Sequence, residues 1–168
     1  MTCFCVKIPM YQQYINVEAR WMKEVILRKA AVLDMDSIMK LQISIFEGEQ
    51  KIPAEIIPIA EEMHPQWWCA LLQETVVGAV AAWEEKGTIH WGRFVMDPDY
   101  RGLHIGTRLA KFSLDDLFSQ GIEEIHLEAR EATVKIICSM GGKIMGQTTN
   151  FYEGTVTPLV LYKQDYAS

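Results

Sequence analysis

A strand, a glycine-containing loop and a long helix follow one another in the middle of the chain. Residues 88–96 have the composition of a strand, and Asp97-Pro98-Asp99 ends it abruptly. Apolar residues then recur at helical spacing from Ile105 onwards, and Gly121 supplies a C-terminal stop. We therefore expect a strand end, a loop and a helix N-terminus to lie side by side.

The loop between this strand and this helix is expected to bind an anion. The first N–H groups of a helix lack intrahelical partners and lie at the positive end of the helix dipole, which favours phosphate groups. Gly102 and Gly106 let the backbone approach such a ligand, and Arg101 and Arg108 add positive charge. The loop lacks both the Gly-Lys-Ser/Thr of a Walker loop and the Gly-x-Gly-x-x-Gly of a dinucleotide-binding site.

The regular part of the chain predicts one α/β domain with the element order β-α-α-β-β-β-α-β-α-β-β. No repeat or low-complexity stretch interrupts it, and Pro58 is expected to shorten or kink the second helix. The expected strands are 25–30, 66–73, 75–83, 88–96, 125–129, 143–147 and 155–163. The expected helices are one that Asp34 caps and Glu47-Gly48-Glu49 ends, one from Pro53 towards Met63, 105–121, and 132–140.

Residues 1–24 show no persistent period of two or 3.6 residues and are assigned to an N-terminal extension, which leaves 25–168 as the domain. Tyr11, Tyr14 and Trp21 favour an extension that docks on the domain or on a partner subunit, and disorder is the alternative. A homodimer is compatible with these aromatic residues.

Composition and charge exclude several classes of protein. The 168 residues are 49% hydrophobic, which provides a substantial core and excludes intrinsic disorder and a disulfide scaffold. Sixteen basic and 22 acidic residues give a net charge of −6, which argues against nucleic acid and anionic membranes as partners. No apolar run approaches the roughly 18 to 20 residues that span a bilayer. The four cysteines have no zinc spacing, so we expect no metal and a reduced, cytoplasmic compartment.

The run Arg101-Gly102-Leu103-His104-Ile105-Gly106 resembles the pyrophosphate-binding signature of the GNAT superfamily of acyl-CoA-dependent N-acetyltransferases, Gln/Arg-x-x-Gly-x-Gly/Ala. The preceding Val95-Met96-Asp97-Pro98-Asp99-Tyr100 is similar to the strand and turn that lead into that signature. The resemblance extends from about Val25 to Lys163, because the element order is also that of the family. It implies an α/β fold with a mixed, mostly antiparallel central sheet, flanked by helices and splayed between its fourth and fifth strands.

The resemblance also implies acetyl-CoA as cosubstrate, bound without a metal in the cleft where those two strands separate. The main chain of the fourth strand is expected to pair with the pantetheine arm, and an N–H group there to polarise the thioester carbonyl. The backbone N–H groups that follow Arg101 are expected to hold the pyrophosphate. The residues that this assigns to cofactor binding are Phe94, Val95, Met96, Arg101, Gly102, Leu103, His104, Ile105, Gly106 and Thr107.

Three positions depart from the family pattern. His104 stands where the family usually has its central glycine: its backbone N–H can bind phosphate if its φ is negative, its side chain can lie near the phosphates, or it has no role. The tyrosine that many members use to protonate the departing CoA thiolate falls on Ile137, and the asparagine at the helix start falls on Glu131. The usual general acid is therefore absent, and water is an alternative proton source.

Catalytic candidates come from the fourth and fifth strands and the closing hairpin. Strand alternation places the even-numbered residues 90–96 on one face of the fourth strand, with His90 a remote candidate for the base. Glu128, near the splay, is the favoured residue for binding the acceptor amine or acting as base, and a solvated carboxylate is the alternative. Tyr152, in the hairpin turn, is the candidate for replacing the missing acid, and an exposed turn tyrosine is the alternative.

The sequence thus predicts an N-acetyltransferase that moves an acetyl group directly from acetyl-CoA to a primary amine of a small molecule or to an amino-terminal group. Glu47, Glu49, Glu61 and Glu62 favour a cationic amine, and a solvated face is the alternative. The main rival function is a sensor or regulatory module that binds acyl-CoA, which Ile137 favours. A nucleotide-binding domain that holds ATP or a dinucleotide at the same helix terminus is the third.

Overall fold

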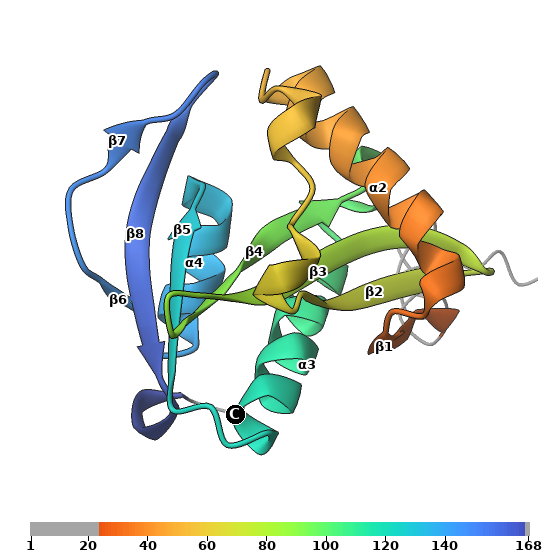
Figure 1. The fold of residues 1–168 in the computed structure, drawn as a ribbon. Helices are drawn as coiled ribbons and strands as arrows, with labels where there is room; N and C mark the ends of the chain where they lie inside the picture. Colours follow the sequence, from red (N-terminus) through yellow and green to blue (C-terminus); the bar gives the residue numbers. More distant parts are fainter. Residues whose placement is uncertain (1–23, 167–168) are drawn as a thin grey trace, which may run out of the picture.

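The computed structural model describes residues 24–166, which form one open sheet with helices on both faces (Figure 1). The strands are β1 Ile26–Lys29, β2 Gln66–Leu72, β3 Thr75–Glu85, β4 Thr88–Met96, β5 Glu124–Ala129, β6 Lys143–Ile144, β7 Thr149–Asn150 and β8 Thr155–Tyr162. The α-helices are α2 Met35–Ile43, α3 Ile105–Ser119 and α4 Glu131–Ser139. The short helical turns are η1 Val32–Asp34, η2 Ser44–Glu49, η3 Ala54–Ile56, η4 Glu61–Met63, η5 Pro98–Tyr100 and η6 Lys163–Asp165.

The sheet is antiparallel except at its centre, where it opens. The strand order is β1-β2-β3-β4-β5-β8-β6, and β7 pairs with β8 beside this path. β4 and β5 run parallel, as a helical crossover through α3 requires, and they are joined at one residue pair, His90 and His126. Beyond this pair the two strands separate, which confirms the expected splay (Figure 1).

Two apolar clusters lie on opposite faces of the sheet. On one face α3 packs against β1, β2 and β3, and it buries Leu109, Leu114 and Leu117. On the other face α2 packs against β3 and β4 and buries Ile38. The indole N–H of Trp91 on β4 donates to a buried hydroxyl of α3 at 2.9 Å, which satisfies its polar group inside the core.

A bulge in β4 changes which residues share a face, and the expected alternation is wrong beyond Gly92. Ala81 pairs with Gly92 but Ala79 pairs with Val95, so β4 has one more residue than β3 in this stretch. Arg93 lies in the bulge and has a φ of +52°, which accommodates the extra residue. Trp91 and Phe94 therefore lie on the α3 face with their rings 5.3 Å apart, while Val95 packs on the α2 face.

The segment 53–63 was expected to form a helix, and this prediction is wrong. It forms only the two short turns η3 and η4. Pro58 lacks the N–H group that a continuous helix needs at an interior position, and His64 ends the segment in the left-handed conformation with a φ of +48°. The helical path that begins in α2 continues through η2 and ends at Glu49, where the sequence predicted that the helix would end.

Candidate active site

A cavity of about 420 Å³, the cofactor cleft, lies between the end of β4, the first turn of α3 and the first turns of α4. Of the residues expected to bind the cosubstrate, all except two line it. The exceptions are Ile105, which is buried in the core, and Leu103, which packs against the core. Ala132, Thr133 and Ile136 of α4 form the opposite wall.

The loop that leads into α3 bends through two residues with positive φ. Gly102 has a φ of +79° and His104, the N-cap of α3, has a φ of +58°. The backbone N–H of His104 was expected to bind phosphate only if the φ of this residue were negative. The observed φ is positive, so this condition is not met. Non-glycine residues adopt this conformation at a cost of about 1–2 kcal/mol. His104 nevertheless lines the cofactor cleft, so the histidine occupies a glycine-like backbone position at the cavity.

Gly106 lies where α3 packs closely against β4. A Cβ atom at this position would lie 3.2 Å from Cγ of Met96 and 3.2 Å from Cζ of Phe94. The first turn of α3 therefore lies directly against the part of β4 that is expected to pair with pantetheine. A larger side chain would push the helix N-terminus away from the strand.

Arg101 lies at the mouth of the cofactor cleft, where it contacts both strand and helix. Its Nη2 is 3.1 Å from a carboxylate oxygen of Glu49 at the end of η2, and its Nε donates to the carbonyl oxygen of Met96 at 3.2 Å. Glu49 was expected to favour a cationic acceptor, but it lies in the cofactor cleft beside this guanidinium.

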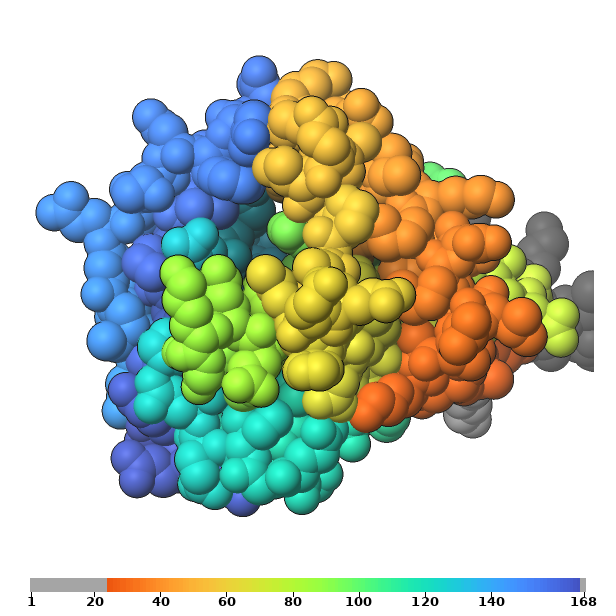
Figure 2. Space-filling model, viewed as in Figure 1, coloured from red at the N-terminus to blue at the C-terminus, as the bar shows by residue number. Residues whose placement is uncertain are grey.

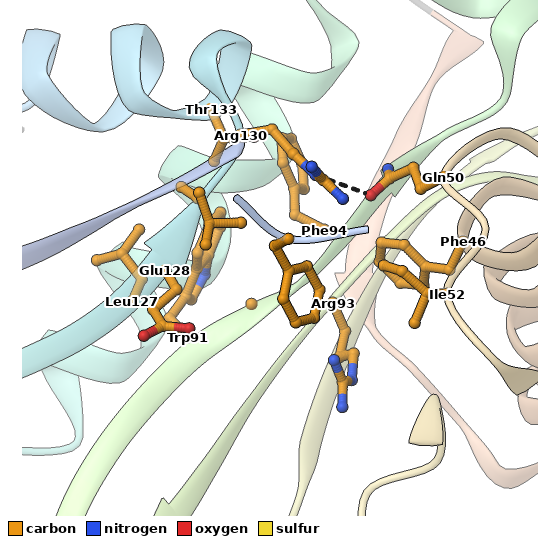
Figure 3. A pocket seen from close by; sticks show the side chains of 14 residues that line it. Phe46, Gln50, Ile52, Trp91, Arg93, Phe94, Leu127, Glu128, Arg130 and Thr133 are labelled. Carbon is orange, nitrogen blue, oxygen red and sulfur yellow. Dashed lines mark hydrogen bonds between the residues drawn. The ribbon is translucent and has the colours of Figure 1, made fainter. Parts of the chain in front are cut away.

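A smaller cavity of about 100 Å³, the central cavity, opens where β4 and β5 separate (Figure 3). Phe94, Gln50, Arg130 and Thr133 line both this cavity and the cofactor cleft, so the two are adjacent. Its apolar walls come from η2 and the segment after it, from β4, β5 and β8, and from the turn after β7. Residues that line it include Phe46, Ile52, Trp91, Leu127, Phe151 and Val156.

Contacts between η2 and the β7–β8 turn cover the central cavity. Arg130, the N-cap of α4, donates through Nε to Oε1 of Gln50 at 3.0 Å (Figure 3). The backbone N–H of Glu153 donates to the carbonyl oxygen of Gln50 at 3.3 Å. In Figure 2 the segment after α2 meets the β7–β8 region above a hollow.

Arg130 is a site residue that sequence reasoning missed. Its Nη1 donates to the carbonyl oxygen of Thr155 at 3.4 Å, its guanidinium lies 5.6 Å from the Phe151 ring, and its buried Nη2 has no partner among the described residues. Burial lowers the pKa of this guanidinium. A Cβ at Gly154 would lie 2.5 Å from its Nη1, so a side chain there would displace the guanidinium. In the sequence, Arg130 directly follows the apolar end of the predicted strand 125–129, and this position could have indicated a place in the site.

A third cavity of about 410 Å³, the acceptor cleft, continues from the central cavity on the side opposite the cofactor cleft. Arg93, Glu128 and Phe151 line both. Glu128 is exposed, and Figure 3 shows it on β5 across the opening from Arg93 on β4. His90 lies in the acceptor cleft, with its ring stacked on Trp83 at 5.7 Å.

The remaining expected residues lie away from the cavities. Tyr152 is 51% exposed, has a φ of +48° and lines none of the three cavities, whereas its neighbour Phe151 lines two of them. Ile137, at the position of the usual general acid, is fully buried, and Glu131 forms an ion pair with Lys135 at 2.8 Å. The structure therefore places Glu128 at the central cavity and the acceptor cleft and leaves Tyr152 on the turn.

Within residues 24–166, no three His, Cys, Asp or Glu side chains are grouped closely enough to hold a metal ion. In the same range, no helix has the length and apolar character that a membrane crossing needs.

The comparisons with known proteins agree with this geometry. No curated protein sequence matches the chain. Escherichia coli ElaA has a similar structure, with a TM-score of 0.70 and 13% identity over 81% of this chain and 98% of that one. An aminoglycoside 6'-N-acetyltransferase complexed with coenzyme A has a TM-score of 0.63 and 18% identity, over 82% and 96%. A chain of the NatC complex bound to Gag peptide and CoA has a TM-score of 0.66 and 18% identity, over 83% and 98%. The model of the acetyltransferase (GNAT) family matches residues 35–137, more than half of the sequence, and the chain belongs to this family.

Proposed function

We propose that this protein transfers an acetyl group from acetyl-CoA to a primary amine of a small molecule or to an amino terminus. The observation that carries the proposal is the row of three adjacent cavities at the splay between β4 and β5, in which neighbouring cavities share lining residues. One end holds a helix N-terminus suited to pyrophosphate, and the other end is open to an acceptor. Two of the similar structures, the aminoglycoside acetyltransferase and the NatC complex, are bound to CoA.

The residues of the cofactor cleft fit acetyl-CoA. The N–H groups of Gly106 and Thr107 belong to the first turn of α3 and have no intrahelical acceptor, so they suit a pyrophosphate with Arg101 beside it. The edge of β4 that faces β5 is unpaired after His90. The backbone at Phe94 to Met96 can therefore pair with an extended pantetheine arm as it would with another strand.

The central cavity is where the acyl carbon and the amine would meet. The amine nitrogen attacks the thioester carbonyl carbon, a C–N bond forms, the C–S bond breaks, and CoA leaves as the thiolate. A backbone N–H group of the bulged part of β4 stabilises the negative charge that develops on the carbonyl oxygen. Glu128 lines both the central cavity and the acceptor cleft, so its carboxylate is placed to accept the proton that the amine loses. Water supplies the proton for the thiolate, since Ile137 has none to give.

Calorimetric titration with acetyl-CoA, CoA and ATP is the first test. Micromolar binding of both CoA compounds, with much weaker binding of ATP, is expected because the β4 edge contributes only when a pantetheine arm is present. A panel of amines with thiol release as the signal then tests transfer. Equal affinity for ATP and CoA would refute the cofactor assignment.

A sensor or regulatory module of the same fold is the second candidate, favoured by the buried Ile137 and by the position of Tyr152 outside the cavities. It predicts tight binding of acetyl-CoA without turnover of any amine. Sustained turnover with one amine excludes it.

A further inference from the structure

Arg93 occupies an unusual place in the site, because it is the residue that accommodates the bulge in β4. Its φ of +52° sets it apart from the regular strand, and it lines both the central cavity and the acceptor cleft. Its backbone is anchored by Gln42 of α2, whose Nε2 donates to the Arg93 carbonyl oxygen at 2.5 Å. The guanidinium is thus held on the acceptor side by the fold of the strand itself.

This guanidinium has no carboxylate partner among the described residues. Its Nη2 donates to the carbonyl oxygen of Ile56 at 2.9 Å, its buried Nε has no partner, and its Cζ lies 5.7 Å from the Trp83 ring. Burial lowers the pKa of Arg93, because removal of a cation from water disfavours its charged form. A guanidinium has five N–H donors, so most of its hydrogen-bonding capacity is unused by the protein. A partly buried cation with unused hydrogen-bond donors is well suited to bind an anionic group of a ligand.

The carboxylates that were expected to attract a cationic acceptor do not line the central cavity. Glu49 pairs with Arg101 in the cofactor cleft, and Glu61 lines a separate cavity beside β2. Among the described residues, the charged groups of the central cavity are Arg93, Arg130 and Glu128. The central cavity therefore has one carboxylate and two guanidinium groups, and Glu85 adds a carboxylate at the acceptor cleft, so the site presents both charges to an acceptor.

We infer that the acceptor is an amino carboxylate, whose amino group lies at Glu128 and whose carboxylate is bound by Arg93. The inference rests on the proposed acetyltransferase function and names the class of its acceptor. Arg93 and Glu128 come from the two strands that separate at the splay, and both line the central cavity and the acceptor cleft (Figure 3). A planar guanidinium matches a carboxylate through two parallel hydrogen bonds, which a lysine at this position would not provide. Arg130, on the cofactor side, remains next to the acyl group.

The test uses matched acceptors that differ in the carboxylate alone. Phenylalanine is compared with phenethylamine and with phenylalanine methyl ester, and 4-aminobutyrate is compared with butylamine, so that two spacings between amine and carboxylate are sampled. The variants are Arg93→Gln and Arg93→Lys. Arg28→Gln is the control, because Arg28 lies on β1 and lines none of the three cavities. Thiol release gives kcat/KM, and calorimetry measures acceptor binding to the full chain saturated with CoA.

For at least one pair, the acid is expected to exceed its amine and ester in kcat/KM by about tenfold to a hundredfold, the effect of hydrogen bonds to a charged group. Arg93→Gln should lower that ratio to near one by reducing turnover of the acid far more than turnover of the amine. Arg93→Lys should recover only part of it. Arg28→Gln should keep the wild-type ratio. A residue that only supports the fold would lower both rates together, so the ratio separates the two roles.

Two results would overturn the inference and leave the acetyltransferase function intact: amines acetylated as well as their acids at both spacings, or a ratio that Arg93→Gln does not change. Failure of every acceptor to turn over would overturn the proposed function instead. Calorimetry then decides the inference separately. Acids that bind no tighter than their amines refute it, and a preference for acids that Arg93→Gln removes supports it.

Discussion

Replacement of Gly106 by alanine tests whether the N-terminus of α3 holds acetyl-CoA. Alanine gains up to about 1 kcal/mol over glycine in a helix. The new Cβ would lie 3.2 Å from both Met96 Cγ and Phe94 Cζ, so these side chains must shift by a few tenths of an ångström at a cost of similar size. We therefore expect Gly106→Ala to change the free energy of unfolding by less than about 1 kcal/mol.

Binding should respond much more strongly than stability. The contact that shifts lies between the expected pyrophosphate turn and the strand expected to bind pantetheine, and the two must bind one ligand together. Loss of one hydrogen bond to a charged phosphate costs about 1.5–3 kcal/mol, which weakens binding about tenfold to a hundredfold. Calorimetry with acetyl-CoA measures this loss, and thermal unfolding checks that the variant is folded.

Gly48→Ala is the matched control, because a Cβ at Gly48 meets no atom within 4 Å. It should bind acetyl-CoA like the wild-type protein. If Gly106→Ala also binds with wild-type affinity, the reasoning is refuted, and the pyrophosphate site lies elsewhere than at the first turn of α3.

Three further predictions concern single side chains. Glu128→Gln should lower kcat by about 10²–10⁴-fold without changing the Kd of acetyl-CoA, since it removes a base and not a cofactor contact. A fall in acetyl-CoA affinity as large as the fall in kcat would contradict this role. Glu49→Gln should tighten acetyl-CoA binding by up to about fivefold at low salt, because it removes a carboxylate beside Arg101 in the cofactor cleft, and the gain should shrink in high salt. The hydrogen bonds that Arg28 donates to Asp34 at 2.7 and 2.8 Å lower the pKa of this carboxyl group below its ordinary 3.8. As the pH falls, the carboxyl group is therefore protonated in the unfolded chain before it is protonated in the folded protein. The stabilisation from this carboxylate is lost as the pH falls below about 4. Urea unfolding should show wild type and Asp34→Asn differing at pH 7 and converging towards pH 3, and a constant difference would exclude this linkage.

The row of cavities explains why the cofactor side was easier to predict than the acceptor side. The strand end, the Arg101–Gly106 loop and the start of α3 are consecutive in sequence, so local pattern and turn chemistry place them together. The acceptor side is assembled from β4, β5, the β7–β8 turn and the segment after α2, which are distant in sequence. Its charge could not be predicted from the number of glutamates, because Glu49 pairs with Arg101 instead of facing the central cavity.

The amino-acid sequence by itself determined most of the element order and the loop before α3, because strand and helix periodicity, glycine and proline act through neighbouring residues. It predicted a helix over 53–63 that does not form, and it did not predict β7. Only the tertiary structure decided which side chains meet in the site. The bulge at Arg93 exists in the pairing of β4 with β3, and it reverses the faces that simple alternation assigns. The contact of Arg130 with Gln50 joins residues 80 positions apart. Such contacts depend on how whole elements pack, and no local pattern around either residue encodes its partner.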